Sequence, residues 1–244
     1  MGQKDIYQFD YLEDYEKPFI HSEKIIQGKK CYIYKNGKSD VLLIQAIDGH
    51  DLEVLDQEAE IIKQAVPGTP FTLAAFLVED WNNELSPWNA PAVFGQADFG
   101  SGAAETLAFI TGTLIPELCA ADGKKHILLG GYSLSGLFAL WAAYQTDLLN
   151  GIAAVSPSVW FPGWTDYIES NTIRSPQVYL SLGSKEEKTR NKTMAAVGEN
   201  IRRQYELLTG TNAVERCILE WNPGNHFADS EKRMAKGFAW LMNR

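Results

Sequence analysis

The stretch Gly130-Gly131-Tyr132-Ser133-Leu134-Ser135-Gly136 lies between two segments with different hydrophobic patterns. Residues 126–129 are mainly apolar and strand-like, and the longer apolar run 137–144 favours a helix. A strand, a sharp turn with a central serine and a helix together predict a nucleophile elbow. Strand and helix then approach so closely that only small residues fit two positions before and after the serine. Gly131 and Ser135 meet that requirement around Ser133, whereas Leu137 would violate it around Ser135.

The elbow pattern has a non-catalytic alternative. A tight strand–helix turn can also bind an anion on its backbone N–H groups, and short glycine–serine patterns occur by chance. Catalysis by Ser133 requires a base, an acid that orients the base, and an oxyanion hole.

The base can be sought by elimination among four histidines. His21 lies in a polar segment, and His126 opens the strand before the elbow, at the wrong end of a parallel sheet for catalysis. His50 and His226 remain. His226 follows the last expected strand and gives the chain order serine, acid, histidine that is typical of α/β hydrolases. We therefore expect His226 to be the base, the alternative being a histidine that caps a helix or packs in its loop.

The acid is expected after the strand that precedes the last one. Glu186 lies three residues beyond Gly183 and is the first candidate, and Glu187 is the second. A carboxylate there would orient the imidazole and stabilise its charged form. Both glutamates belong to the charged run 184–188, and such runs are usually solvated faces. A Ser-His dyad without a carboxylate is a further alternative.

The oxyanion hole needs two backbone N–H groups. Leu134, directly after the nucleophile, is expected to supply one. The turn after the apolar run 41–47 is expected to supply the other, from Gly49 first and His50 next. The His50 side chain could also contact substrate. A metal site at this turn is disfavoured, because no second pair of ligands has a recognisable spacing.

Composition indicates one α/β domain over residues 1–244. The chain has 244 residues, of which 45% are hydrophobic and 22% charged, and its net charge is −9. Nucleic acid and anionic membranes are unsuitable partners for so acidic a chain. No apolar run is long enough to span a membrane, and no secretory leader is recognisable. Three widely spaced cysteines fit neither a disulfide framework nor a zinc site. A cytoplasmic location is expected.

Strands alternate with helices along most of the chain, which predicts a mostly parallel sheet covered on both faces. Residues 1–28 are read as a polar edge segment. Asn36-Gly37 predicts a hairpin turn, Asp51 a helix cap, and Pro116 a kink or an early helix end. Strands are expected at 31–35, 41–47, 71–78, 126–129, 151–156, 177–182 and 214–221, and helices after Asp51 and at 103–118, 137–144, 194–208 and 230–242.

Two aromatic insertions, near 79–102 and 157–171, lack a regular hydrophobic period. Trp88 and Trp160 are the candidates that we expect to contact substrate. Aromatic walls accept acyl chains, aryl groups and sugar rings alike, so they do not identify the substrate. Lid packing without substrate contact is the alternative. Trp81, Phe161 and Trp164 are the other aromatic candidates.

These motifs resemble the esterase family of α/β hydrolases that includes esterase D, feruloyl esterases and enterochelin esterases. The similar segments are Asp48-Gly49, Leu85-Ser86-Pro87-Trp88, the elbow 131–136, Ser156-Pro157-Ser158-Val159-Trp160 and Asn225-His226-Phe227. The chain departs from the family at Ser135, where glycine is commoner, and at its acid, a glutamate in a polar run.

The resemblance implies an α/β-hydrolase fold and cleavage of a small-molecule carboxylic ester through an acyl-enzyme, with no metal or cofactor. An acyltransferase or a thioesterase would use the same machinery, and a non-catalytic binding module on this scaffold is a third possibility. The pattern does not specify the ester or the oligomeric state.

Overall fold

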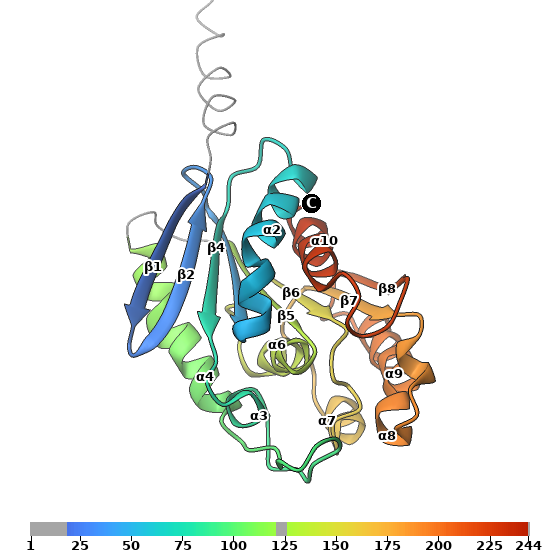
Figure 1. Ribbon diagram of the computed structural model, residues 1–244. Helices are drawn as coiled ribbons and strands as arrows, with labels where there is room; N and C mark the ends of the chain where they lie inside the picture. The colour runs from blue at the N-terminus through green and yellow to red at the C-terminus, as the bar shows by residue number, and fades with distance from the viewer. Residues whose placement is uncertain (1–18, 121–125, 244) are drawn as a thin grey trace, which may run out of the picture.

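The computed structural model describes residues 19–120 and 126–243. An eight-stranded sheet forms its centre, in the order β1-β2-β4-β3-β5-β6-β7-β8 (Figure 1). The six strands from β4 to β8 are parallel to their neighbours, and β2 runs antiparallel between β1 and β4. The strands are β1 (Ile20–Ile26), β2 (Lys29–Lys35), β3 (Val41–Ile47), β4 (Thr72–Leu77), β5 (His126–Tyr132), β6 (Gly151–Val155), β7 (Gln177–Gly183) and β8 (Arg216–Asn222).

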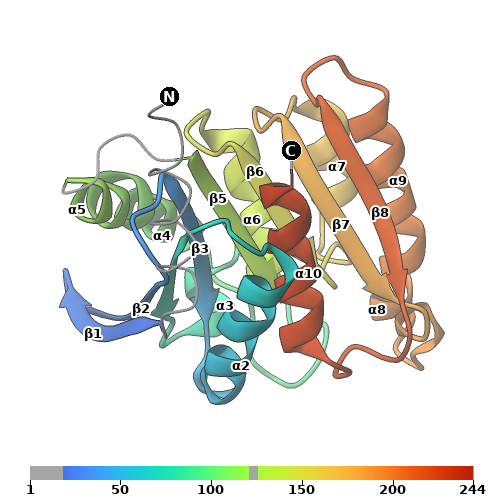
Figure 2. The same cartoon turned by 90° about the horizontal axis from the view of Figure 1, so that it is seen from above.

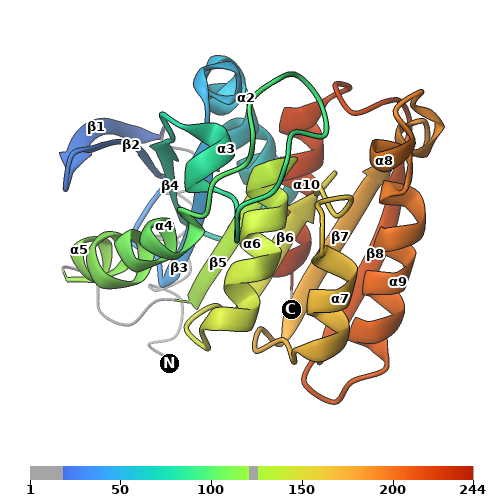
Figure 3. The same ribbon diagram turned by 90° about the horizontal axis from the view of Figure 1, so that it is seen from below.

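Helices cover both faces of the sheet. Figure 2 shows α2 and α10 on one face, and Figure 3 shows α4, α6, α7 and α9 on the other. Two separate hydrophobic cores correspond to these two faces. The helices are α2 (Gly49–Ala65), α3 (Trp81–Glu84), α4 (Ala103–Phe109), the π-helical turn η1 (Ile110–Leu114), α5 (Ile115–Cys119), α6 (Leu134–Gln145), α7 (Trp164–Ser170), the 3-10 turn η2 (Glu186–Lys188), α8 (Lys192–Ala195), α9 (Val197–Thr209) and α10 (Ser230–Met242).

The central elements agree with the sequence patterns. The run 41–47 is buried along its whole length as β3, because helices cover both of its faces. Residues 134–144 of α6 are all buried, as expected of a helix that is apolar on every side. The expected mostly parallel sheet with helices on both faces is confirmed.

The hairpin prediction at Asn36-Gly37 is wrong. The chain leaves β2 there but does not pair it with β3, because β4 lies between them in the sheet. The Asn36 side chain instead accepts a hydrogen bond from the N–H of Phe71 at 2.7 Å. The hairpin lies earlier, between β1 and β2, where Gln27 and Gly28 have φ values of 48° and 83°. Both are the positive values that tight hairpin turns require.

Two local helix predictions also need correction. Asp48, not Asp51, caps α2, and Asp51 closes a capping box by accepting from the N–H of Asp48. Of the two effects expected at Pro116, a kink or an early helix end, the early end does not occur. The π-helical turn η1 precedes Pro116, and the helix continues to Cys119.

The second aromatic insertion contains a regular helix. Residues 164–170 form α7, whose Trp164 and Ile168 are buried, although this segment was expected to be irregular. Trp164 and Tyr167 of this helix both pack against Trp88 and Tyr144.

The edge prediction for the amino-terminal segment is confirmed for β1, which pairs only with β2. Residues 1–18 of that segment lie outside the described part of the chain. All three cysteines are free thiols. Within residues 19–120 and 126–243, no helix has the length and apolar character needed to cross a bilayer.

Candidate active site

Ser133 lies at a strained turn between β5 and α6. Its backbone has φ 58° and ψ −121°, a region that non-glycine residues rarely adopt. The close approach of strand and helix explains the small neighbours. A Cβ atom on Gly131 would lie closer than 3.0 Å to the backbone of Ser135, and one on Gly136 would lie 2.8 Å from the carbonyl of Gly131. The Ser135 hydroxyl fits because it donates to the carbonyl of Ala46 at 2.9 Å.

The structure brings Ser133, His226 and Glu186 together from three different loops. The Nε2 atom of His226 lies 3.0 Å from the Oγ of Ser133. Its Nδ1 lies 2.7 Å from the Oε2 of Glu186. All three side chains follow the carboxyl ends of parallel strands, β5, β8 and β7, which is where α/β sheets build their sites. This is the connectivity of a nucleophile, a base and an orienting acid.

Glu186 is a buried carboxylate that its neighbours hold in the charged form. Burial raises its pKa, but the hydrogen bonds to His226, Ser156 and the N–H of Gly183 outweigh burial and leave the pKa below its ordinary value. Oε1 accepts from Gly183 at 2.6 Å and from the Ser156 hydroxyl at 2.7 Å. Oε2 is therefore left to face the imidazole.

Sequence reasoning missed the groups behind this carboxylate. Arg233 of α10 is 3% exposed, and its guanidinium lies 3.5 Å from the Oε1 of Glu186. It also donates to the Tyr132 hydroxyl at 3.1 Å and to the carbonyl of Pro223 at 2.7 Å. Tyr132 in turn donates to the carbonyl of His226 at 2.7 Å. Arg233 therefore connects Glu186 to the loop that carries His226. A charged residue on the inner face of α10 was the available signal.

Glu187, the second candidate for the acid, points to a different partner. Its carboxylate forms an ion pair with Arg202 at 2.9 Å. The two adjacent glutamates thus have separate roles in the structure, and only Glu186 contacts His226.

The two expected oxyanion donors lie at neighbouring helix starts. Leu134 is the first residue of α6, and its N–H has no acceptor within that helix. Gly49 begins α2 directly after β3, which pairs in parallel with β5 so that Gln45 lies opposite Gly130. This register brings the end of β3 beside the elbow. The N–H of His50 donates to the Asp48 carboxylate at 2.7 Å, so it is engaged in the helix cap.

The His50 side chain is 79% exposed and lies 3.9 Å from Glu53. The structure therefore shows no contact between this side chain and the groups around Ser133. No cluster of three or more histidine, cysteine or acidic side chains in the described ranges could hold a metal ion.

A cavity of about 280 Å³ opens beside His226. Trp160 lines it, whereas Trp88 does not. The indole N–H of Trp88 donates to the carbonyl of Pro162 at 2.9 Å, and its ring packs against Phe161, Trp164 and Tyr167. Of the two expected substrate contacts, Trp160 is at the site and Trp88 packs within the insertions. The full lining is Trp160, Lys185, Glu186, Thr189, Met194, Val197, Asn225, His226 and Phe227.

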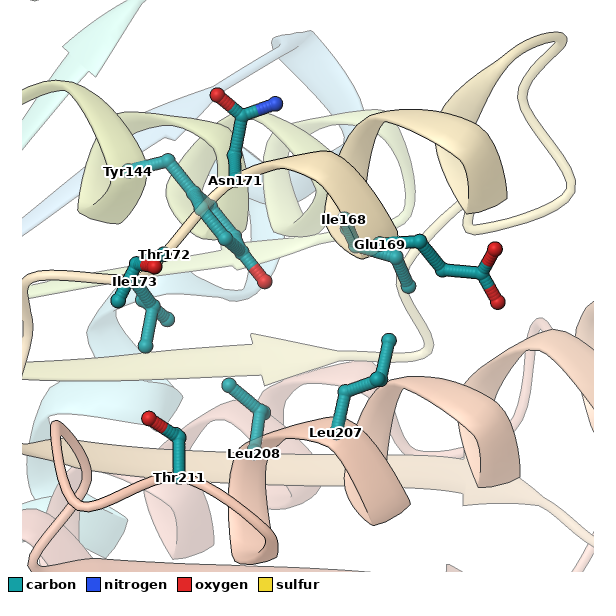
Figure 4. Close-up of a pocket in the computed structure, with 9 residues that line it drawn as sticks. All are labelled: Tyr144, Ile168, Glu169, Asn171, Thr172, Ile173, Leu207, Leu208 and Thr211. Carbon is teal, nitrogen blue, oxygen red and sulfur yellow. The ribbon is translucent and has the colours of Figure 1, made fainter.

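A second cavity, of about 170 Å³, lies away from this site (Figure 4). It is formed where α6, α7 and α9 end, and Tyr144, Asn171 and Thr211 are among its lining residues. Helices that follow parallel strands run back toward the amino ends of those strands. This cavity is therefore at the opposite end of the sheet from Ser133.

Comparison with known proteins identifies the fold. No protein-family model and no curated sequence matches the chain. Among solved structures, the siderophore hydrolase EstA from Aspergillus nidulans superposes with a TM-score of 0.74, at 16% identity, over 93% of this chain and 95% of its own. The chain has the α/β-hydrolase fold.

Two further structures share this arrangement. An IroE-like serine hydrolase from Shewanella oneidensis gives a TM-score of 0.75 at 14% identity, over 90% of this chain and 79% of that one. Enterochelin esterase from Shigella flexneri gives 0.65 at 15% identity, over 93% of this chain but only 59% of that one. At these identities the likeness is one of fold.

Proposed function

We propose that this protein is a serine esterase that cleaves carboxylic esters with a Ser133-His226-Glu186 triad. The observation that carries the proposal is the continuous hydrogen-bonded series from the Oγ of Ser133 to Nε2 of His226, at 3.0 Å, and from Nδ1 to Oε2 of Glu186, at 2.7 Å. A neutral hydroxyl is a weak nucleophile, and a base in this position activates it.

In acylation, Ser133 is the nucleophile and His226 transfers the proton. The Oγ of Ser133 attacks the ester carbonyl carbon, and its proton moves to Nε2 of His226. The N–H groups of Leu134 and Gly49 stabilise the negative charge that develops on the carbonyl oxygen. When the tetrahedral intermediate collapses, the bond to the alcohol oxygen breaks and the imidazolium returns its proton to that oxygen. Glu186 stabilises the imidazolium without taking the proton.

Deacylation repeats these steps with water. The neutral imidazole of His226 takes a proton from a water molecule, which attacks the acyl carbonyl. Collapse breaks the bond to Oγ, and the proton from Nε2 returns to Ser133. The carboxylic acid leaves and the free enzyme is restored.

The names of the structurally similar proteins support the proposal of an ester substrate. The similar structures described above are named as a siderophore hydrolase, a serine hydrolase and an enterochelin esterase. The elbow strain at Ser133 and the buried, charged Glu186 are features that a binding module would not need.

Initial rates on p-nitrophenyl esters from acetyl to octanoyl, with wild type and Ser133→Ala side by side, test the proposal. We expect Ser133→Ala to lower kcat by at least about 10³-fold while its melting temperature is unchanged. Equal rates for the two proteins would contradict a serine mechanism. Adding an alcohol acceptor and measuring the new ester separates acyl transfer from hydrolysis.

A further inference from the structure

The cavity beside His226 combines apolar walls with one cation that has no ion-pair partner among the residues that the structure describes. Trp160, Met194, Val197 and Phe227 supply apolar surface, and Phe227 is 86% exposed. Lys185 is the cation among the lining residues. A cavity of about 280 Å³ is at the lower end of ligand-site volumes and suits a group of about one ring.

Lys185 is fixed to the site by its backbone. Its N–H donates to the carbonyl of Gly224 at 3.0 Å, and the N–H of Ser184 donates to the carbonyl of Asn222 at 2.8 Å. These bonds join the loop after β7 to the loop that carries His226. The backbone of Lys185 is therefore fixed beside the loop of the catalytic base, and its exposed side chain starts from that position.

Within residues 19–120 and 126–243, this lysine has no carboxylate as an ion-pair partner. Glu186, the acidic residue that lines the cavity, is engaged by Arg233, Ser156 and His226. Glu187 is turned to Arg202. Across the part of the chain that the structure describes, no carboxylate lies within ion-pair distance of Lys185.

Most of the charged side chains in the segment 185–192 are cations. Besides Lys185 these are Lys188, at the end of η2, Arg190, and Lys192, at the start of α8, and all three are exposed. A chain of net charge −9 thus presents a local excess of cations beside its candidate active site. Such an arrangement raises the local concentration of anionic ligands.

The position relative to His226 indicates which half of the ester meets Lys185. The imidazole must give its proton to the departing alcohol oxygen, so the alcohol half lies on the imidazole side of the reacting carbonyl. His226 and Lys185 both line the cavity, so a group held there adjoins both side chains.

On the basis of the proposed esterase function, we propose that the substrate is an ester whose alcohol half carries an anionic group, and that Lys185 binds that anion. An ammonium–carboxylate contact in a partly apolar cavity is a charge-assisted hydrogen bond and stronger than a neutral one. Trp160 and Phe227 would contact the ring or chain that bears the anion.

The test compares two acetate esters of equal size, 4-acetoxybenzoate and 4-acetoxybenzamide. We expect Lys185→Gln to lower kcat/KM for the anionic ester about tenfold and for the neutral ester less than twofold. Lys185→Arg should retain the preference. Lys192→Gln removes the same charge from the start of α8 but no cavity-lining group, and should change the ratio of the two kcat/KM values less than twofold.

Binding is measured separately, on Ser133→Ala, from the tryptophan fluorescence change on adding 4-hydroxybenzoate or 4-hydroxybenzamide. Lys185→Gln in that background should weaken binding of the carboxylate alone. Turnover of both esters with no selective effect of Lys185→Gln overturns the anion site and leaves the esterase proposal standing. Selective binding without turnover by wild type of any ester overturns the esterase proposal instead.

Discussion

Glu186 is the residue whose role depends most on its surroundings. In sequence it is one of two adjacent glutamates in a charged run, which is usually a solvated face. In the structure it is 8% exposed and accepts hydrogen bonds at both oxygens. Glu186 and Glu187 are neighbours, so sequence alone does not decide which of them is the acid. A shift of the turn by one residue would exchange the side chain that points inward.

Glu186→Gln should lower kcat about 10³- to 10⁴-fold, because an amide does not stabilise the imidazolium of His226. Steady-state kinetics on a p-nitrophenyl ester measures this. Glu187→Gln is the matched control, since that side chain pairs with Arg202, and it should retain activity within about threefold. Comparable losses in the two variants would contradict the assignment of the acid.

The depressed pKa of Glu186 also has a consequence for stability. A carboxyl whose pKa is lower in the folded than in the unfolded state stabilises the fold above its unfolded pKa of about 4.3, and that contribution is lost as the pH falls through the folded value. The melting-temperature difference between wild type and Glu186→Gln should therefore be largest near pH 7 and shrink below about pH 4.

Arg233 is a positioning residue that acts through Glu186. Arg233→Met removes a buried positive charge from the carboxylate and from the loop of His226. We expect kcat/KM to fall about tenfold, with the loss in kcat rather than in KM, because the carboxylate that orients the imidazole loses a buried partner. Arg233→Lys keeps the charge and should recover most of kcat. A loss of rate that Arg233→Lys does not recover would indicate a purely structural role.

At the scale of elements, the elbow is constrained by the contact between β5 and α6. Gly131→Ala would place a Cβ against the backbone of Ser135, so the helix must shift. We expect a loss of about 3 kcal/mol in the free energy of unfolding and a fall in kcat, both measurable by urea denaturation and kinetics. Gly112→Ala is the control, because open space surrounds that glycine within a helix, and it should be neutral or slightly stabilising. Equal effects would contradict the close approach.

Helix α2, which begins at the proposed oxyanion turn, carries a buried carboxyl on its inner face. Glu58 is 4% exposed, and burial, together with the nearby charge of Asp51, raises its pKa well above the ordinary value, although Gln45 hydrogen-bonds to it. Glu231 of α10 faces it as well. Burial and the Asp48 carboxylate raise the pKa of Asp51 to about 6. The helix is therefore less stable when both groups are charged.

Glu58→Gln should stabilise the fold at high pH. Because the pKa of Glu58 is raised on folding, the folded protein holds the proton more tightly, and stability falls as the pH rises above about 4.3. The variant should gain about 1 kcal/mol at pH 8 and lose that advantage near pH 4. Glu60→Gln, an exposed position on the same helix, should change stability by less than about 0.5 kcal/mol. A gain that is independent of pH would contradict this account.

At the scale of the whole molecule, alternation of strands and helices predicted the fold because the apolar runs are long and their periods clear. The run 41–47 becomes β3 and 230–242 becomes α10, at the expected boundaries. Strand order was the harder part. The residues Asn36-Gly37 suit a hairpin turn. In the sheet, however, β4 lies between β2 and β3, and the pairing of β2 depends on which strands bury their apolar faces together.

Those site residues could be predicted that directly follow a recognisable strand. Ser133 and His226 follow from the elbow and from the strand ends, and the structure brings them to 3.0 Å. The contacts of Arg233 and Ser156 with Glu186 could not be predicted, since the two residues approach it only when α10 and β6 are packed beside β7. Trp88 and Trp160 were indistinguishable as aromatic residues in insertions, and only the packing separates them.

The most direct test of the central claim is covalent labelling of the native protein with a fluorophosphonate, followed by peptide mass spectrometry. A serine activated by a neighbouring base reacts with this reagent, and an ordinary serine does not. We predict a single adduct on Ser133, lost in Ser133→Ala and strongly slowed in His226→Ala. No adduct on a folded wild-type protein, or labelling of another serine, would contradict the claim that Ser133 is an activated nucleophile.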